Sequence, residues 1–163
     1  MPNSRFFFNN FQVLVPQTIF NTTCFDVSVR KEYKKLDIEK YKELLHGYEG
    51  PAVSIGYLKD TSDCYSLIYC TAAACYLPNL AVYSRSGELL ETTPIASGCG
   101  SDMGYECDEK VEIMSSNQII TVKKEKSYEY DSLLQVINSS VKMNVSKIKY
   151  TVKNSKILID TLQ

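Results

Sequence analysis

The residues with the clearest chemical potential are four acidic side chains in residues 97–109, a stretch that also holds three of the seven glycines and two of the six cysteines. Carboxylates in a glycine-rich turn are the hard oxygen ligands that calcium prefers, so Asp102, Glu106 and Asp108 are candidate calcium ligands. Glu109 completes the acidic group. The spacing does not match the EF-hand loop, and a solvated acidic loop is the simpler interpretation. Apart from calcium, the sequence suggests no cofactor.

The same carboxylates could act as the acid and the base of a hydrolase that cleaves glycans or peptides. Enzymes of the glycan-cleaving class usually hold sugar on aromatic platforms, and this chain has no tryptophan. His46 is the sole histidine, and we expect it in the last turn of a helix, where a cation is favourable. The nucleophile-elbow, dinucleotide and phosphate-loop patterns are absent from the sequence. The sequence therefore predicts no catalytic residue.

Six cysteines are many for a reduced compartment, and none of them forms a C-x-x-C pair. Cys99 and Cys107 could close the glycine-rich stretch into a ring, and Cys70 and Cys75 are a second candidate pair if a turn lies between them. Cys64 and Cys70 cannot pair if they share a strand, because six residues at 3.3 Å each separate them by roughly 20 Å. Oxidising export explains the cysteines best; the alternative is that some are small buried apolar residues.

The charge pattern excludes nucleic acid as a partner. Net charge is −1 at pH 7, and basic residues do not gather in a patch that would bind phosphates. We expect Lys123, Lys124 and Lys126 to lie on a solvated strand face. The longest apolar stretch, residues 6–20, is interrupted by two asparagines and a proline, so it predicts neither a transmembrane segment nor a signal peptide. If the protein is exported, the chain is then the mature form.

Alternating apolar and polar residues predict a mainly β fold. One amphipathic helix is predicted near residues 38–46, between an N-cap at Asp37 and Gly47. Turns are predicted at Gly87, at residues 115–117 and at residues 153–155. We expect a single domain over residues 1–163, α+β in class, with an antiparallel meander arranged as a sandwich or barrel. The predicted strands lie at 11–15, 22–29, 52–58, 64–70, 73–77, 80–84, 110–114 and 118–126, within 133–152, and at 157–159.

One part of the chain, residues 65–125, resembles a pattern in small exported proteins and lipoproteins of gut-type Gram-negative bacteria. The matching residues are Tyr83-Ser84-x-x-Gly87-x-Leu89, Gly98-Cys99-Gly100 and Gly104-Tyr105-x-Cys107-x-Glu109-x-Val111-x-Ile113. Those proteins are of unknown function. The resemblance therefore implies export to the periplasm or cell surface and a β fold, and a lipid anchor on a segment preceding residue 1 would fit it. It carries over no functional residue.

These observations favour a non-catalytic exported protein that binds another protein. Twelve tyrosines support this hypothesis, because tyrosine is enriched in interfaces, although tyrosines that fill the core explain them equally well. Tyr105 and Met103 are the candidate contact residues. Two alternatives stay open: a hydrolase that uses residues 102–109, and a periplasmic immunity or inhibitor protein, which the small size and the disulfides would suit.

Overall fold

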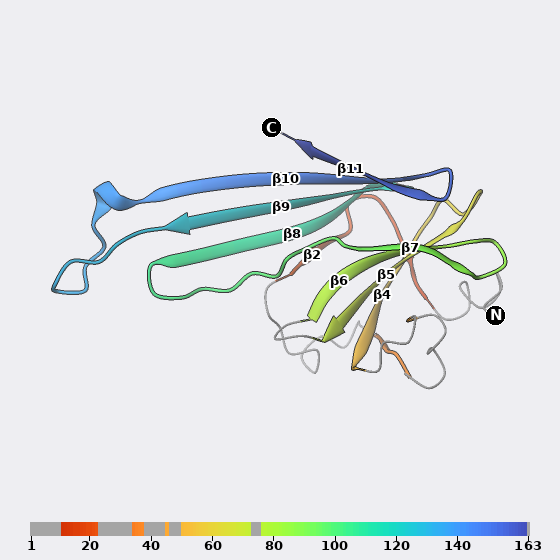
Figure 1. The fold of residues 1–163 in the computed structure, drawn as a ribbon, viewed down its shortest axis with the longest axis horizontal. Coiled ribbons are helices and arrows are strands. Elements are labelled where there is room, and N and C mark those ends of the chain that lie inside the picture. The colour runs from red at the N-terminus through yellow and green to blue at the C-terminus, as the bar shows by residue number, and fades with distance from the viewer. Residues whose placement is uncertain (1–10, 23–33, 38–44, 46–49, 73–75, 163) are drawn as a thin grey trace.

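Two β-sheets make up most of the computed structural model, which describes residues 11–22, 34–37, 45, 50–72 and 76–162 (Figure 1). In the first sheet the order is β1-β4-β5-β6-β7, with β3 also paired to β4. Its strands are β1 (Val13–Leu14), β3 (Lys34–Lys35), β4 (Ala52–Leu58), β5 (Tyr65–Ala72), β6 (Tyr76–Tyr83) and β7 (Leu89–Pro94).

The second sheet has the order β11-β10-β9-β8-β2. Its strands are β2 (Ile19–Asn21), β8 (Tyr105–Ser115), β9 (Gln118–Ser127), β10 (Lys142–Lys153) and β11 (Lys156–Leu162), and a 3-10 turn spans Asn138–Ser140. Apart from β1 on β4, the pairs of described strands are antiparallel. The predicted mainly β, antiparallel fold is confirmed, in sandwich form. The predicted helix near 38–46 falls outside the described residues, apart from Leu45, which lies in a turn.

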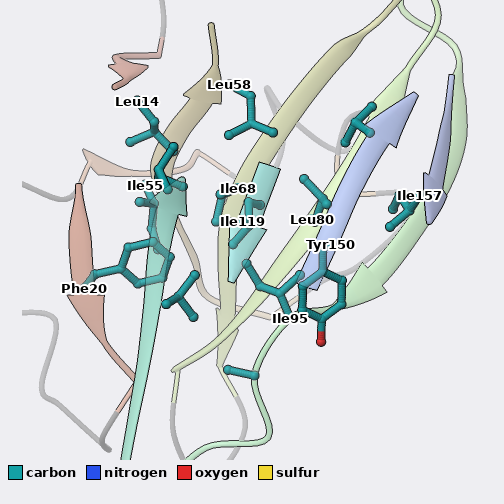
Figure 2. Packing of buried hydrophobic residues seen from close by; sticks show 14 of the residues in the cluster. Leu14, Phe20, Ile55, Leu58, Ile68, Leu80, Ile95, Ile119, Tyr150 and Ile157 are labelled. Atoms are coloured by element: carbon teal, nitrogen blue, oxygen red, sulfur yellow. The ribbon is translucent and has the colours of Figure 1, made fainter. Parts of the chain in front are cut away.

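The sheets pack face to face around one cluster of buried side chains (Figure 2). Because side chains alternate along a strand, every second residue of β8, β9 and β10 faces the first sheet where the two sheets overlap. Burying each large aliphatic side chain contributes roughly 2 kcal/mol. The first sheet supplies Ile55, Ile68 and Leu80, and the second supplies Ile119, Tyr150 and Ile157, among others.

The first sheet is covered on its other face too. All seven residues of β4 and the first six of β5 are buried. A second cluster combines Tyr57, Tyr65, Tyr69 and Tyr83 with Leu36 and other residues from outside the central strands. With Tyr150, five of the nine described tyrosines are buried, so the core-filling interpretation holds for them.

The structure corrects the prediction of separate strands at 73–77 and 80–84, because β6 runs unbroken from Tyr76 to Tyr83. Pro78 is tolerated within it. The Pro78 carbonyl accepts a hydrogen bond from Ile95 N–H at 3.0 Å, beside the Asn79–Pro94 pair that ends the β6–β7 ladder, so it points toward β7. Within a strand, the nitrogen and the carbonyl of one residue point to the same side. The Pro78 nitrogen therefore faces away from β5, and its missing N–H removes no hydrogen bond to β5.

The predicted turns are confirmed. Gly87 has φ +90° and donates its N–H to Ser84 O at 2.9 Å in the β6–β7 hairpin. Asn154 and Ser155 both have positive φ and connect β10 to β11. Residues 116–117 connect β8 to β9. Most of the strand predicted at 22–29 lies outside the described residues.

A three-stranded arm extends past the first sheet at one end of the molecule (Figure 1). β2 pairs only with residues 110–112 of β8, and β11 only with residues 147–153 of β10. Beyond these residues, β8, β9 and β10 continue as three paired strands, with neither β2 nor β11 beside them. We define the arm as residues 105–109, 123–127 and 142–146, and its tip as residues 128–141. In the part of the chain that the structure describes, no helix is long and apolar enough to cross a membrane.

Candidate functional site

The connection from β7 to β8, residues 95–104, is a strap that lies along the inner side of the second sheet. Three kinds of contact fasten it there. Thr121 Oγ1 donates to Ile95 O at 2.6 Å, a disulfide links Cys99 to Cys107 with 5.3 Å between their Cα atoms, and Asp102 pairs with Tyr105 through two backbone hydrogen bonds. The strap is therefore held along its length.

Glu109 supplies a fourth attachment and is only 2% exposed. Its Oε1 accepts hydrogen bonds from the N–H and Oγ of Ser97, both at 3.2 Å. Its Oε2 accepts from Gly98 N–H at 2.9 Å and from Thr22 Oγ1 at 2.7 Å. Gly98 has φ +81°, which a residue with a Cβ adopts only with strain. Two successive N–H groups thus converge on one carboxylate.

The cysteine predictions have mixed outcomes. The Cys99–Cys107 disulfide is confirmed. Cys64 and Cys70 are both buried free thiols, as expected for two residues that share a strand face. The Cys70–Cys75 pair is wrong, because Cys70 points into the core opposite Pro78 and carries a free thiol. Cys75 itself lies outside the described residues, as does His46.

Glu106, Asp108 and Glu109 lie in a strand rather than in a loop, which corrects another prediction: β8 begins at Tyr105 instead of residue 110. Glu106 approaches Lys126 at 3.5 Å, and Asp108 approaches Lys110 at 3.5 Å. By alternation these two carboxylates face away from Glu109.

The third calcium candidate, Asp102, accepts a hydrogen bond from Met103 N–H at 2.7 Å. Among the described residues, no group of three or more Asp, Glu, His or Cys side chains is arranged to hold a metal ion. The calcium interpretation of Asp102, Glu106 and Asp108 therefore has no geometric support.

A shallow hollow of about 390 Å³ lies on the arm. The candidate contact residue Tyr105 lies close by and donates its hydroxyl to Glu125 Oε1 at 2.7 Å. Lys123 Nζ approaches the same oxygen at 2.9 Å, and these two contacts, together with Asn144, lower the pKa of Glu125 to about 2, with Lys123 the largest cause. The hollow is lined by Ser101, Glu106, Cys107, Asp108, Lys124, Glu125, Lys126 and Met143.

A second cavity, of about 240 Å³, lies between the strap and the inner side of β9 and β10, and we call it the strap cavity. Its apolar wall is formed by Pro94, Ile95, Ala96 and Ile148. Its polar lining residues are Ser97, Glu109, Thr121, Lys123, Ser146 and Tyr150.

Sequence reasoning missed the strap cavity, although a signal for it is present. Glu109 alternates with Val111 and Ile113, and Tyr150 alternates with Ile148 and Val152, so both belong to the buried face. The second candidate contact residue, Met103, lies in the strap and is 75% exposed.

Comparison of the chain with protein-family models, with curated proteins and with solved structures finds no match.

Proposed function

We propose that this protein is a non-catalytic binding module, exported to the periplasm or the cell surface, whose arm binds another protein. The exposure of large apolar side chains at the arm end carries the proposal: Met143 is 72% exposed, Leu133 75% and Met103 75%. Tyr128 N–H donates to Gly104 O at 2.9 Å, which places the Met103 turn beside the start of the tip. Single exposed apolar residues need no explanation, whereas several at one protruding end favour a contact surface.

The hollow on the arm indicates what the partner's surface offers. Met143 contributes a flexible apolar wall, and methionine is enriched in interfaces. Glu106 and Asp108 on β8 and Lys124 and Lys126 on β9 give the rim both signs of charge. A partner fits this surface if it has one protruding apolar side chain surrounded by both positively and negatively charged residues.

The Cys99–Cys107 disulfide supports export, since such bonds persist in oxidising compartments. The resemblance of residues 65–125 to exported proteins and lipoproteins supports the same location, with or without a lipid anchor. Alkylation of the protein inside the producing cell, before lysis, tests this. A reduced Cys99–Cys107 pair under those conditions would contradict export.

A binding module accounts for the acidic residues better than a hydrolase does. The Glu106 and Asp108 side chains are 49% and 47% exposed and lie beside lysines. A carboxylic acid that must hold a proton for catalysis is usually desolvated or placed beside another carboxylate. An immunity or inhibitor protein would be a special case of the proposal, decided by the identity of the partner.

Photocrosslinking in the producing cells tests the proposed surface. We expect benzoylphenylalanine at position 143 to form a discrete adduct with one protein, and Leu133→Lys to weaken that adduct several-fold. The matched control is benzoylphenylalanine at Glu88, which is exposed in the β6–β7 hairpin of the first sheet. Failure of positions 103, 133 and 143 to give any adduct, in variants with native circular dichroism, would overturn the proposal.

A further inference from the structure

The strap cavity has the size and lining of a small-molecule site. Liquid water occupies about 30 Å³ per molecule, so 240 Å³ has room for a ligand of on the order of eight heavy atoms. Ile95 is fully buried and Ile148 is half-buried, and together they give the cavity an apolar wall. Binding sites commonly combine such a wall with a few placed polar groups.

The Tyr150 hydroxyl is the polar group that points to a ligand. The residue is 5% exposed, and its hydroxyl has no hydrogen-bond partner in the described part of the chain. Figure 2 shows this oxygen pointing away from the aliphatic side chains that surround the ring. The hydroxyl oxygen is not enclosed by protein, so it is available to a molecule in the strap cavity, which Tyr150 lines.

Most other polar groups of the cavity already have partners. Thr121 Oγ1 donates to Ile95 O, and the Glu109 oxygens accept four hydrogen bonds. Lys123 Nζ and the Tyr105 hydroxyl both contact Glu125 Oε1, and the Lys123 ammonium group keeps unused N–H donors. The unused capacity at the cavity is therefore that of groups that can donate: the Tyr150 O–H, the Ser146 O–H and the Lys123 N–H groups. A ligand with an acceptor oxygen fits them.

The charges around the cavity favour an uncharged ligand. Glu125 compensates the charge of Lys123, and the Glu109 carboxylate forms part of the lining. Burial, and secondarily the charge of Glu109, raise the pKa of Tyr150. An anion in the cavity would experience the same Glu109 charge and would lose its hydration.

We infer that the strap cavity binds a small uncharged carbonyl compound, such as a lactone, ester or amide, with its oxygen on Tyr150 and a short apolar body against Ile95 and Ile148. The strap cavity shares no lining residue with the arm hollow. Strand alternation places Lys123 and Ile148 on the side of the sheet opposite Lys124 and Met143.

Titration with γ-octalactone, observed by methyl and amide NMR, tests the inference, with octanoate as the matched anion of equal carbon number. We expect saturable shifts of the Ile95 and Ile148 methyl signals with the lactone, and at least tenfold weaker binding of octanoate. The absence of saturable shifts at these methyl groups would overturn the site. Equal or tighter binding of octanoate would overturn the assignment of an uncharged ligand.

Variants separate a specific site from adventitious binding. Tyr150→Phe removes only the unpartnered oxygen and should weaken lactone binding about fivefold, the usual value of one hydrogen bond. Tyr130→Phe, in the tip, is the matched control and should bind as the unmodified protein does. Ser146→Phe, which places a large ring in the cavity lining, should block the cavity and abolish lactone binding. Equal affinity of the Tyr150→Phe and Tyr130→Phe variants, or undiminished binding by Ser146→Phe, would contradict the inference.

Discussion

At the scale of single residues, Glu109 is a structural carboxylate. Isolated charges are expensive to bury, and Glu109 offsets this cost with donors from Thr22, Ser97 and Gly98. These donors come from the end of β2 and from the strap, so one side chain connects two segments to β8. Because its acceptor positions are occupied, Glu109 is poorly placed to act as a base.

Replacing Glu109 with glutamine should destabilise the protein by about 3 kcal/mol, because the amide turns N–H donors toward N–H donors in a buried place. Urea unfolding measures this loss. Glu106→Gln, three residues earlier and on the exposed face of β8, is the matched control and should cost about 0.5 kcal/mol or less. Similar losses of unfolding free energy in the two variants would contradict the prediction that the buried contacts of Glu109 stabilise the fold more than the exposed contacts of Glu106 do.

From its residue type alone, Glu109 was predicted to be solvated together with the other acidic residues. The alternation of buried and exposed residues in β8 could have corrected this prediction. Glu109, Val111 and Ile113 occupy every second position, and the two apolar residues identify the buried face. The four donors could not be predicted. They come from residues 11 to 87 positions away in the chain, and only the packed strap and β2 bring them together.

At the scale of elements, the strap depends on its disulfide. In the chain-entropy model, closing the short loop between Cys99 and Cys107 contributes roughly 2.5 kcal/mol. A Cys99→Ser/Cys107→Ser variant should lose about this much stability. It should also exchange the amides of residues 97–104 faster, whereas those of β5 at the centre of the first sheet should change little once corrected for global stability. Hydrogen exchange measures both, and equal acceleration in the strap and in β5 would contradict a local role.

The core strands were predictable as elements, and so was β9, whereas the arm segment of β8, residues 105–109, was not. β4 and β5 are rich in apolar and aromatic residues, so the sequence locates them within about two residues. The segment 105–109 lacks that signal because polar cross-strand contacts hold this part of the arm. Tyr105, Lys123 and Asn144 converge on Glu125, and Glu106 faces Lys126 across the strands. Such pairs are recognisable only once the register is known.

At the scale of the whole molecule, the first sheet is buried on both faces. The second sheet covers one of its faces, and Leu36, Leu45 and Phe11 belong to the cluster on the other. This arrangement buries several hydroxyl and thiol groups together with the apolar residues. The strap cavity and the arm hollow both lie on the second sheet. The first sheet covers this sheet on one face only, and the arm extends beyond that contact.

The buried phenols and thiols predict a loss of stability in alkali. Burial raises the pKa of Cys70 from 9.0 to about 12, and it also raises the pKa values of Tyr69 and Tyr83 above 10.0. Because these groups stay protonated longer in the folded state, their contribution is fully present below pH 9 and is lost as pH rises through 9–12. The free energy of unfolding should therefore be nearly level from pH 7 to 9 and then fall.

Urea titrations at stepped pH, with tyrosine ionisation followed by ultraviolet absorbance, measure this fall. Tyr83→Phe should make the decline above pH 10 shallower, because phenylalanine has no proton to lose in either state. If Tyr83 ionises near pH 10 in the folded protein, or if Tyr83→Phe keeps the slope of the unmodified protein, the second cluster is open to water and the first sheet is not covered on that face.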